Sequence, residues 1–310
     1  MVLTNNNYYS KEANKAYMSV SQFKDFTKCE AMAMAKLNGE FEQSKTTALL
    51  VGSYVDSYFE GTLEEFKETN PEIFSVKIFE DENTAKLLPE EYLTKNGTIK
   101  TNKLSEAKKL FPETFVKTLT LKSDYIQAET IIKRVEKDKL FMEYMAGKKQ
   151  IIRTGELFGA KWKIKIDSLC KDKIVDLKCM RSMDRIMGMS FVEHWHYDWQ
   201  MAIYREIERF SRQKKRKKNV PALKTYLAVA TKETPTNLEI IHIPDWHLQE
   251  CLDEIEKLMP RVLEVKSGQA EPERCGVCEY CRQTKVLKEP IEFDEVGFSN
   301  KDLKVMRGEM

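Results

Sequence analysis

Two carboxylates and one amine lie close together within residues 164–180 (IKIDSLCKDKIVDLKCM). Polar and apolar residues alternate on either side of a short polar stretch, which predicts two strands joined by a tight turn. Asp167 ends the first strand. On the second strand, Asp176 and Lys178 are two residues apart and therefore share one face. Such a group of acids and an amine suits the binding of a metal ion and a phosphate.

The register of these two strands decides which charges meet. A turn at residues 171–172 places Asp167 directly opposite Asp176, where like charges repel. A turn one residue later instead pairs Asp167 with Lys178. A divalent cation offsets the repulsion in the first register, because Mg²⁺ binds one or two carboxylates and leaves its other positions to water and phosphate. Lys178 would then orient water or neutralise phosphate charge, and the alternative is a surface hairpin whose charges face solvent.

The neighbouring segments predict a mixed α/β fold with a small sheet. Residues 159–167 should bury Trp162, Ile164 and Ile166 on one face and turn lysines to the other. The last predicted helix should bury an apolar face that includes Trp246. Strands are expected over residues 159–167, 173–178, 224–231 and 238–243, and helices over residues 19–38, 46–60, 190–212 and 245–265.

Further polar residues accompany the two strands. Glu156 precedes the first strand, where it either adds a carboxylate or lies on the surface. Gln200 and Tyr204 are four residues apart in a predicted helix, so they project from the same side of it. Asp56 follows Gly52 by four residues within an apolar helix, where an unpaired carboxylate is costly. These residues are the candidates for a site shared with the acids and the amine.

In their order and spacing, these motifs resemble those of the PD-(D/E)XK nucleases. The likeness is to the RecB-like branch and to the phage exonucleases of the exodeoxyribonuclease VIII type, and it extends from Ser19 to Cys281. In that family an early helix supplies a metal ligand, commonly a His that follows a Gly, and Asp56 stands in this place here. The resemblance implies metal ligands at Asp56, Asp167, Asp176 and the carbonyl of Leu177, and catalytic or positioning roles for Glu156, Lys178, Gln200 and Tyr204.

The resemblance also implies an α/β fold with a restriction-endonuclease-like core, in which helices flank a small mixed sheet. We expect one nuclease domain overall, made of four segments. Residues 1–62 hold the N-terminal helices, and residues 63–150 form a helical insertion. Residues 151–265 form the nuclease core, and residues 266–310 carry a cysteine cluster and the C-terminal tail.

Three cysteines near the C-terminus, Cys275, Cys278 and Cys281, have C-x-x-C-x-x-C spacing. Bacterial ferredoxins use this local spacing and take one further ligand from a distant segment, for which Cys29 is the candidate. We expect a [4Fe–4S] cluster, with tetrahedral Zn²⁺ or no metal as the alternatives. A subset of RecB-like nucleases joins its chain ends by such a cluster, with a longer gap before the last Cys. The remaining cysteines, which we expect to be core residues, are Cys170, Cys179 and Cys251.

The composition indicates a globular protein. The chain has 310 residues, of which 32% are charged, and its net charge is only +2, so overall charge does not point to a nucleic-acid partner. The basic run RQKKRKKN at residues 212–219 is either a DNA contact or a solvated loop. No apolar run approaches the roughly 20 residues of a membrane helix, and the first residues lack signal-peptide features. We therefore expect a soluble cytoplasmic protein without a membrane partner.

These observations lead to one main hypothesis and two alternatives. We expect an exodeoxyribonuclease that depends on Mg²⁺ or Mn²⁺. By resemblance, it is a phage or prophage enzyme that resects double-stranded DNA ends from 5′ to 3′ for recombination and passes the single-stranded product to an annealing protein. Homo-oligomers occur among the similar phage enzymes. The alternatives are a single-strand or flap nuclease of the CRISPR-associated type and a non-catalytic DNA-binding module stabilised by zinc.

Overall fold

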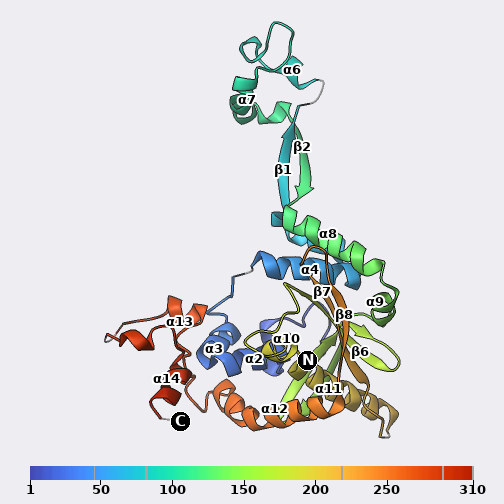
Figure 1. The fold of residues 1–310 in the computed structure, drawn as a ribbon, viewed down its shortest axis with the longest axis vertical. Coiled ribbons are helices and arrows are strands. Elements are labelled where there is room, and N and C mark those ends of the chain that lie inside the picture. Colours follow the sequence, from blue (N-terminus) through green and yellow to red (C-terminus); the bar gives the residue numbers. More distant parts are fainter. Residues whose placement is uncertain (45, 81–82, 218, 288–289, 309–310) are drawn as a thin grey trace. The chain divides into compact units, whose positions relative to one another are not determined.

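The chain forms two compact units in the computed structural model (Figure 1). The first unit comprises Met1–Gly52 and Lys133–Met310, and the second comprises Ser53–Ile132. The structure describes every residue except 45, 81–82, 218, 288–289 and 309–310.

A four-stranded sheet in the first unit contains the predicted strands that follow Asp167. Its spatial order is β5-β6-β7-β8, with β6 and β7 parallel and the other two pairs antiparallel. Parallel neighbours require a long crossover, and α11 (Tyr197–Arg216) lies in that connection. The sheet is therefore mixed and small, as predicted. Its strands are β5 (Ser168–Leu169), β6 (Lys173–Met180), β7 (Lys224–Thr231) and β8 (Leu238–Ile243).

An antiparallel hairpin of β3 (Ile151–Leu157) and β4 (Ala160–Ile166) precedes this sheet. The sequence analysis did not predict β3. Both turn residues, Phe158 and Gly159, have positive φ, as the tightest hairpin turns require. Trp162 and the two isoleucines of β4 are fully buried, as the alternation predicted.

Lys163 shows that the lysine face of β4 is partly covered, although the alternation predicted a half-buried strand. Its side chain is buried, and its ammonium group donates hydrogen bonds to the carbonyl oxygen of Tyr8 and to Oδ1 of Asn14. The N-terminal residues cover this face of the hairpin, which a strand pattern alone does not reveal. Hydrogen-bond acceptors are what make a buried ammonium group tolerable.

The helix predicted over residues 19–38 consists of two helices, α2 (Val20–Lys28) and α3 (Glu30–Asn38). Cys29 separates them because its backbone is extended, with φ −163° and ψ 104°. Gly39 ends α3 in the left-handed conformation, with φ 77°, which a residue without a side chain adopts readily. The interruption at Cys29 turns that cysteine toward the C-terminal segment.

The helix predicted over residues 190–212 is also interrupted. It consists of α10 (Phe191–His194) and α11, with His196 in the left-handed conformation between them. The last long helix, α12 (Asp245–Lys266), agrees with its prediction. Its residues Leu248 and Ile255 are fully buried, and each such side chain contributes about 1.5–3 kcal/mol. Trp246 was wrongly assigned to the apolar face, since it is 66% exposed.

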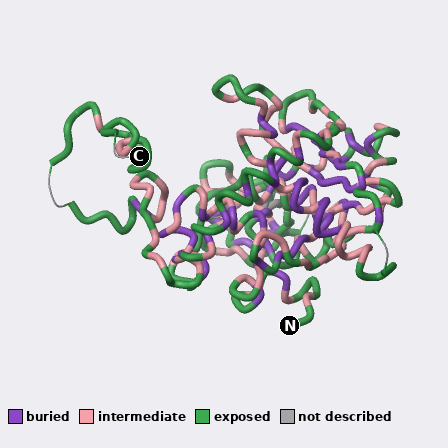
Figure 2. Tube along the Cα trace, turned by 90° about the horizontal axis from the view of Figure 1, so that it is seen from below, coloured by how far each residue is buried: buried purple, intermediate pink, exposed green. Residues whose placement is uncertain are grey.

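Buried residues concentrate where α11 and α12 pack beside the strands. α11 contacts β3, β4 and β7, and α12 contacts α11, α2 and α3. The segment that follows α13 is mostly exposed (Figure 2). The remaining helices of the first unit are α1 (Lys11–Ala16), α9 (Lys139–Tyr144), α13 (Glu279–Gln283), η5 (Phe293–Glu295) and α14 (Asn300–Met306).

The second unit is not purely helical, because it contains an antiparallel hairpin of β1 (Phe74–Phe79) and β2 (Val116–Leu121). Residues between these strands form a small apolar cluster that includes Tyr92 and Phe115. Two helices, α4 (Thr47–Glu60) and α8 (Ser123–Glu136), begin or end in the first unit. The other helices are α5 (Leu63–Thr69), η1 (Pro71–Ile73), α6 (Thr84–Leu87), η2 (Glu90–Tyr92), η3 (Thr101–Lys103), α7 (Leu104–Leu110) and η4 (Pro112–Thr114).

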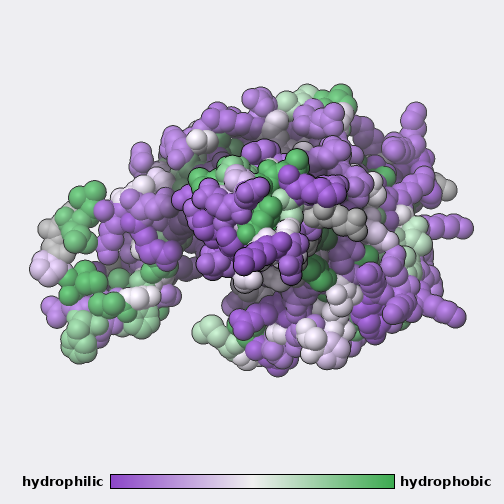
Figure 3. Space-filling model, turned by 90° about the horizontal axis from the view of Figure 1, so that it is seen from above, coloured by the Kyte–Doolittle hydropathy of each residue, from purple (hydrophilic) through white to green (hydrophobic). Residues whose placement is uncertain are grey.

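Across the described residues, we find no helix with the length and apolar character needed to cross a membrane. Hydrophilic side chains dominate the face shown in Figure 3. Both observations agree with the mean hydropathy of −0.52.

Candidate active site

Asp167 and Asp176 have the register that places them opposite each other. Strand β5 pairs with β6 through Ser168 and Val175, so the next step of the same register joins Asp167 and Asp176. Residues 171–172 form the turn, because the residues that flank it are hydrogen-bonded to each other. The first of the two registers considered from the sequence is therefore confirmed, and the alternative pairing of Asp167 with Lys178 is wrong.

Asp167 lies in the bend between β4 and β5, and two donors hold its carboxylate. Oδ2 accepts the peptide N–H of Leu177 at 2.9 Å, and Oδ1 accepts Nε2 of Gln150 at 3.4 Å. Gln150 has φ 51°, an uncommon conformation for a residue other than glycine. The sequence analysis missed Gln150, because no pattern distinguishes it from other polar residues that precede a strand.

Asp176 is 2% exposed and is held by an amide and an ammonium group. Oδ1 accepts Nε2 of Gln200 from α11 at 2.6 Å, and Oδ2 forms an ion pair with Nζ of Lys178 on the same strand face. A buried carboxylate is costly unless it is paired in this way. The structure thus brings together Asp176, Lys178 and Gln200, which the sequence analysis had grouped.

Lys178 remains positively charged in this environment. Burial opposes its charge, but the carboxylates of Asp176 and Asp167 outweigh that effect and raise the pKa of Lys178 above its usual value. Its Nζ also lies 5.0 Å from the ring centroid of Tyr197, within the range of a cation–π contact. The protonated lysine is therefore suited to neutralising a phosphate rather than to accepting a proton.

Lys24 is a second cation at the same aromatic ring, and the sequence analysis missed it. Its Nζ lies 5.2 Å from the ring centroid of Tyr197 and donates a hydrogen bond to the carbonyl oxygen of Trp195 at 2.8 Å. Burial, together with the charge of Lys178, lowers the pKa of Lys24 to about 8. Lys24 comes from α2, far from the strand pair in sequence, so only the tertiary fold reveals its position.

Tyr204 follows Gln200 by one helical turn and lies near the same carboxylates. Burial raises the pKa of Tyr204 well above its ordinary value, and the charges of Asp176 and Asp167 raise it further. Tyr204 therefore keeps its proton and can act as a hydrogen-bond donor. The prediction that Gln200 and Tyr204 project toward the strand pair agrees with these contacts.

Glu156 does not join this group. It pairs with Lys161 near the β3–β4 turn, whereas Asp167 follows the far end of β4, about six residues or roughly 20 Å away. Glu156 instead lines a surface cavity with Arg153 and Lys214. The expectation that it adds a carboxylate to the site is wrong, because closeness in sequence to the strand was mistaken for closeness to its end.

Leu177 and Asp56 are the two remaining residues that were predicted as metal ligands. Leu177 lies between Asp176 and Lys178, and its peptide N–H already binds Asp167. Asp56 is partly buried in α4 and belongs to the second unit. Its role as a metal ligand stays a prediction from the sequence.

The comparisons with known proteins agree with this arrangement. The family described as "PDDEXK-like domain of unknown function (DUF3799)" matches residues 19–284. The chain belongs to this PDDEXK-like family. A crystal structure of a proposed exonuclease from Eubacterium rectale is 44% identical to this PDDEXK-like protein, with a TM-score of 0.76, and the match covers 96% of this chain and 98% of that one.

More distant comparisons add nothing to this assignment. The structure of SSO0001 is 17% identical, with a TM-score of 0.27, and covers 53% of this chain and 77% of its own, which is too remote to support an argument. No curated protein matches the sequence.

The carboxylates of this PDDEXK-like protein suit a hard divalent cation. Asp167 and Asp176 offer oxygen donors from neighbouring strands, and Mg²⁺ and Mn²⁺ prefer such donors. Oδ2 of Asp176 is buried and accepts no hydrogen bond of ordinary geometry. It is in contact with the ammonium group of Lys178 as an ion pair. A cation at Asp176 would therefore compete with Lys178 for this oxygen and leave the ammonium group available for phosphate.

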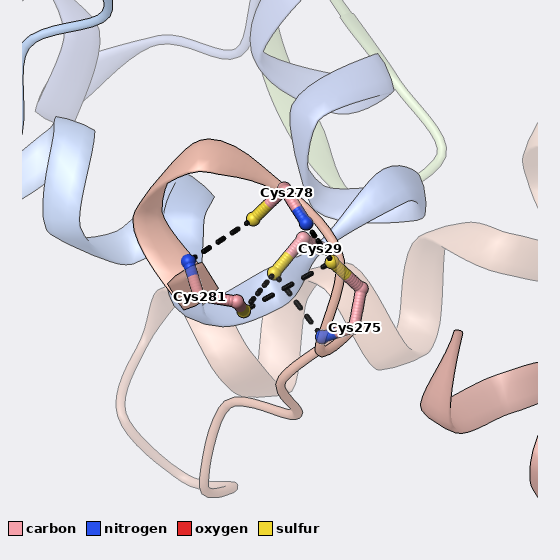
Figure 4. A group of neighbouring side chains, drawn as sticks. All are labelled: Cys29, Cys275, Cys278 and Cys281. Atoms are coloured by element: carbon pink, nitrogen blue, oxygen red, sulfur yellow. Dashed lines mark hydrogen bonds between the residues drawn. The ribbon is translucent and has the colours of Figure 1, made fainter. Parts of the chain in front are cut away.

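Four cysteines from the two ends of the PDDEXK-like domain converge on one point (Figure 4). All four sulfur atoms lie within 4.8 Å of one another. Sγ of Cys281 lies 3.7 Å from that of Cys29 and 3.9 Å from that of Cys275. Peptide N–H groups point at three of the sulfurs, for example from Cys278 to Cys275 at 3.3 Å. The predicted meeting of Cys29 with the C-terminal cysteines is thus present in the structure.

The spacing of the sulfurs tests which metal group they fit. Four thiolates about 2.3 Å from one Zn²⁺ lie about 3.8 Å apart at the corners of a tetrahedron. A [4Fe–4S] cluster binds each thiolate to a different iron and needs wider spacing. Burial disfavours the Cys275 thiolate, but the peptide N–H groups of Val277 and Cys278 outweigh it and lower the pKa of Cys275 to about 7. The two sulfur distances of 3.7 and 3.9 Å are thus close to the spacing around a single tetrahedral ion.

Proposed function

We propose that this PDDEXK-like protein is an exodeoxyribonuclease that depends on Mg²⁺ or Mn²⁺. The observation that carries the proposal is the register that sets Asp167 opposite Asp176, with Lys178 on the same strand face. Asp176 is buried and Asp167 is partly buried. Opposed acids of this kind are unfavourable in a surface hairpin or a DNA-binding module, and they are useful where a cation and a phosphate must bind together.

The reaction is hydrolysis of a phosphodiester bond. The oxygen of water loses a proton to solvent and bonds to phosphorus as the bond to the leaving sugar oxygen breaks, and the leaving oxygen takes up a proton from solvent. When bound at Asp167 and Asp176, a divalent cation supplies Lewis-acid activation and charge neutralisation. Lys178 neutralises the developing negative charge on the phosphate, and Gln200 fixes the position of the Asp176 carboxylate.

The substrate in this proposal is the end of a DNA duplex, and digestion runs from 5′ to 3′. The similarity to the proposed exonuclease from Eubacterium rectale supports the choice of an exonuclease. The product is single-stranded DNA, which an annealing protein would take over during phage or prophage recombination. A homo-oligomer is part of the same proposal.

The four cysteines hold a structural metal ion in this proposal. Their sulfur spacing favours Zn²⁺ over the [4Fe–4S] cluster expected from the sequence. Such an ion would join Cys29 to the C-terminal segment and would stabilise the fold, because its binding free energy is gained only in the folded chain.

A digestion series tests the nuclease proposal. Linear duplexes labelled at the 5′ or the 3′ end, a closed circular duplex and a flap substrate are incubated with Mg²⁺, Mn²⁺ or a chelator. We expect early release of the 5′ label from linear DNA with either cation, no cleavage of circles and no activity with the chelator or with Asp176→Asn. Cleavage of flaps alone would favour the CRISPR-associated type of nuclease. Binding without cleavage of any substrate would favour the DNA-binding module.

A further inference from the structure

A second group of metal-binding side chains lies between α11 and α12, outside the two sites described above. Oδ2 of Asp198 is 2.9 Å from Nε2 of His247. With Sγ of Cys251, these donor atoms all lie within 4.8 Å of one another. Asp198 and Cys251 are each 4% exposed, whereas the His247 side chain is 23% exposed. The group is therefore buried but reachable from solvent through the imidazole.

The fold explains why these three residues meet. His247 and Cys251 are four residues apart on α12 and project from the same face. Asp198 stands at the start of α11, immediately after the interruption at His196. The two helices pack against each other, which sets Asp198 against the pair on α12. The sequence analysis took Cys251 for a core residue, because a cysteine on an apolar helix face has no distinguishing pattern.

From this geometry we infer a zinc site formed by Asp198, His247 and Cys251. Carboxylate oxygen, imidazole nitrogen and thiolate sulfur are the donors that Zn²⁺ binds, at about 2.0–2.3 Å. Tetrahedral donors at those lengths are about 3.3–3.8 Å apart. The three donor atoms lie within 4.8 Å of one another, and Asp198 Oδ2 and His247 Nε2 are 2.9 Å apart, so a small separation of these two atoms would admit the ion. Three protein ligands leave the fourth position to water.

The second nitrogen of His247 provides an independent argument. Metal-bound histidines usually donate their other ring N–H to a carboxylate, which fixes the ring and its tautomer. Nδ1 of His247 lies 3.6 Å from Oε2 of Glu250, whose side chain is 68% exposed and therefore free to approach to hydrogen-bond distance. The imidazole thus has Asp198 at one ring nitrogen and the carboxylate of Glu250 near the other.

The zinc would fasten α11 to α12. Because α11 carries Gln200 and Tyr204, the clamp would hold the helix that contacts the Asp176 carboxylate. This inference does not rest on the nuclease proposal, since metal content can be measured without an enzymatic assay.

Zinc content in His247→Gln tests the inference. Glutamine can still donate a hydrogen bond to Asp198 but is a poor zinc ligand. If His247 only formed a hydrogen bond, the zinc content would therefore not change in His247→Gln. Apoprotein is loaded with Zn²⁺, desalted and analysed for zinc per chain. We expect His247→Gln to bind one zinc fewer than the wild type and Cys251→Ser to show the same loss. The matched control Cys170→Ser, at a partly exposed cysteine outside both groups, should bind as much zinc as the wild type.

Variants at the cysteine cluster separate the two metal sites. Cys281→Ser should lose the zinc of the four-cysteine group and retain that of the Asp198 site. Loading with Co²⁺ provides a second readout. The wild type should show a cobalt–thiolate charge-transfer band, and that band should be weaker in Cys251→Ser and, separately, in Cys281→Ser. Equal zinc content in the wild type, His247→Gln and Cys251→Ser would overturn the inference.

Discussion

Asp167 accepts a hydrogen bond from the peptide N–H of Leu177, with Oδ2 2.9 Å from the nitrogen. This bond fixes the Asp167 carboxylate against the strand that carries Asp176 and Lys178. An N–H bond to a charged acceptor is stronger than one between neutral groups. The backbone, rather than a flexible side chain, therefore sets the distance between the two acids.

Asp167→Asn should separate the role of the charge from that of the hydrogen bond. The Asn oxygen can still accept from Leu177, so we expect little change in stability. Loss of a metal ligand should lower kcat on linear duplex by on the order of 10³-fold, because it removes several kcal/mol of transition-state stabilisation. Asp167→Ala should lose the same activity and a further 0.5–1.5 kcal/mol or so of stability. Activity assays and denaturant unfolding measure the two effects.

The matched control for this prediction is Asp172→Asn. Asp172 is in the same strand connection, and its side chain is 74% exposed. Its variant should retain both the activity and the stability of the wild type. A fully active Asp167→Asn would remove Asp167 from the metal site.

Lys24→Arg should change how activity depends on pH. The pKa of Lys24 is lowered to about 8, so the wild-type lysine is charged below that pH and neutral above it. If Lys24 helps Lys178 to attract phosphate, KM for DNA should rise as the pH increases through about 8. Arginine stays charged in proteins, so the rise should be absent in Lys24→Arg. Steady-state kinetics from pH 6.5 to 9.5 or so test this expectation.

Lys28→Arg is the control for the pH experiment. Lys28 lies in the same helix, α2, and is exposed. Its variant should keep the pH dependence of the wild type. A rise in KM that persists unchanged in Lys24→Arg would show that Lys24 does not contact the substrate.

The sequence predicted the part of the site that depends on local geometry. Alternation of side chains and a two-residue turn limited the pairing to two registers, and the structure has the one that sets Asp167 opposite Asp176. Helical spacing likewise predicted that Gln200 and Tyr204 project from the same side of one helix, and the structure places Gln200 on that helix against Asp176. The strand alternation and the four-residue helical spacing each extend over a few residues, so strand and helix periods determine them.

The parts that the sequence did not predict depend on tertiary packing. Lys24 reaches the ring of Tyr197 from a helix far away in the chain, and Gln150 bonds to Asp167 from a loop without periodicity. The prediction for Glu156 was wrong for the opposite reason. Glu156 is near the site in sequence, but it lies by the β3–β4 turn, at the end of the hairpin away from Asp167. The interruption of the first long helix at Cys29 escaped prediction because cysteine and its neighbours tolerate a helix.

Cys281→Ser should remove the metal of the four-cysteine group and destabilise the protein. Cys281 is buried, and its sulfur is close to those of Cys29 and Cys275. A three-thiolate site binds zinc less tightly, so we expect one zinc fewer per chain and a lower melting temperature. Metal analysis of protein purified under anaerobic conditions makes the measurement. Iron and sulfide in equal amounts, with a broad visible absorption, would instead identify an iron–sulfur cluster.

Lys266 and Lys163 make stability depend on pH in the alkaline range. Both ammonium groups bind Asn14, Lys266 through the backbone oxygen and Lys163 through Oδ1. Burial lowers the pKa of Lys163 to about 8, and burial together with the charge of Lys163 lowers the pKa of Lys266 to about 8. In the unfolded chain both groups return to the usual pKa of 10.5.

The sign of the effect follows from proton binding. Between pH 8 and pH 10.5 the unfolded chain retains protons on these lysines that the folded chain has released, so the free energy of unfolding rises with pH. Lys266→Met removes one of the two groups. Between pH 8 and pH 10.5, the free energy of unfolding of the wild type should therefore rise relative to that of Lys266→Met. Below pH 8, the difference between the two proteins should not change with pH. Denaturant unfolding at several pH values measures it, with Lys257→Met on the exposed face of α12 as the matched control. A difference that stays constant up to pH 10.5 would show that Lys266 keeps its proton in the folded protein.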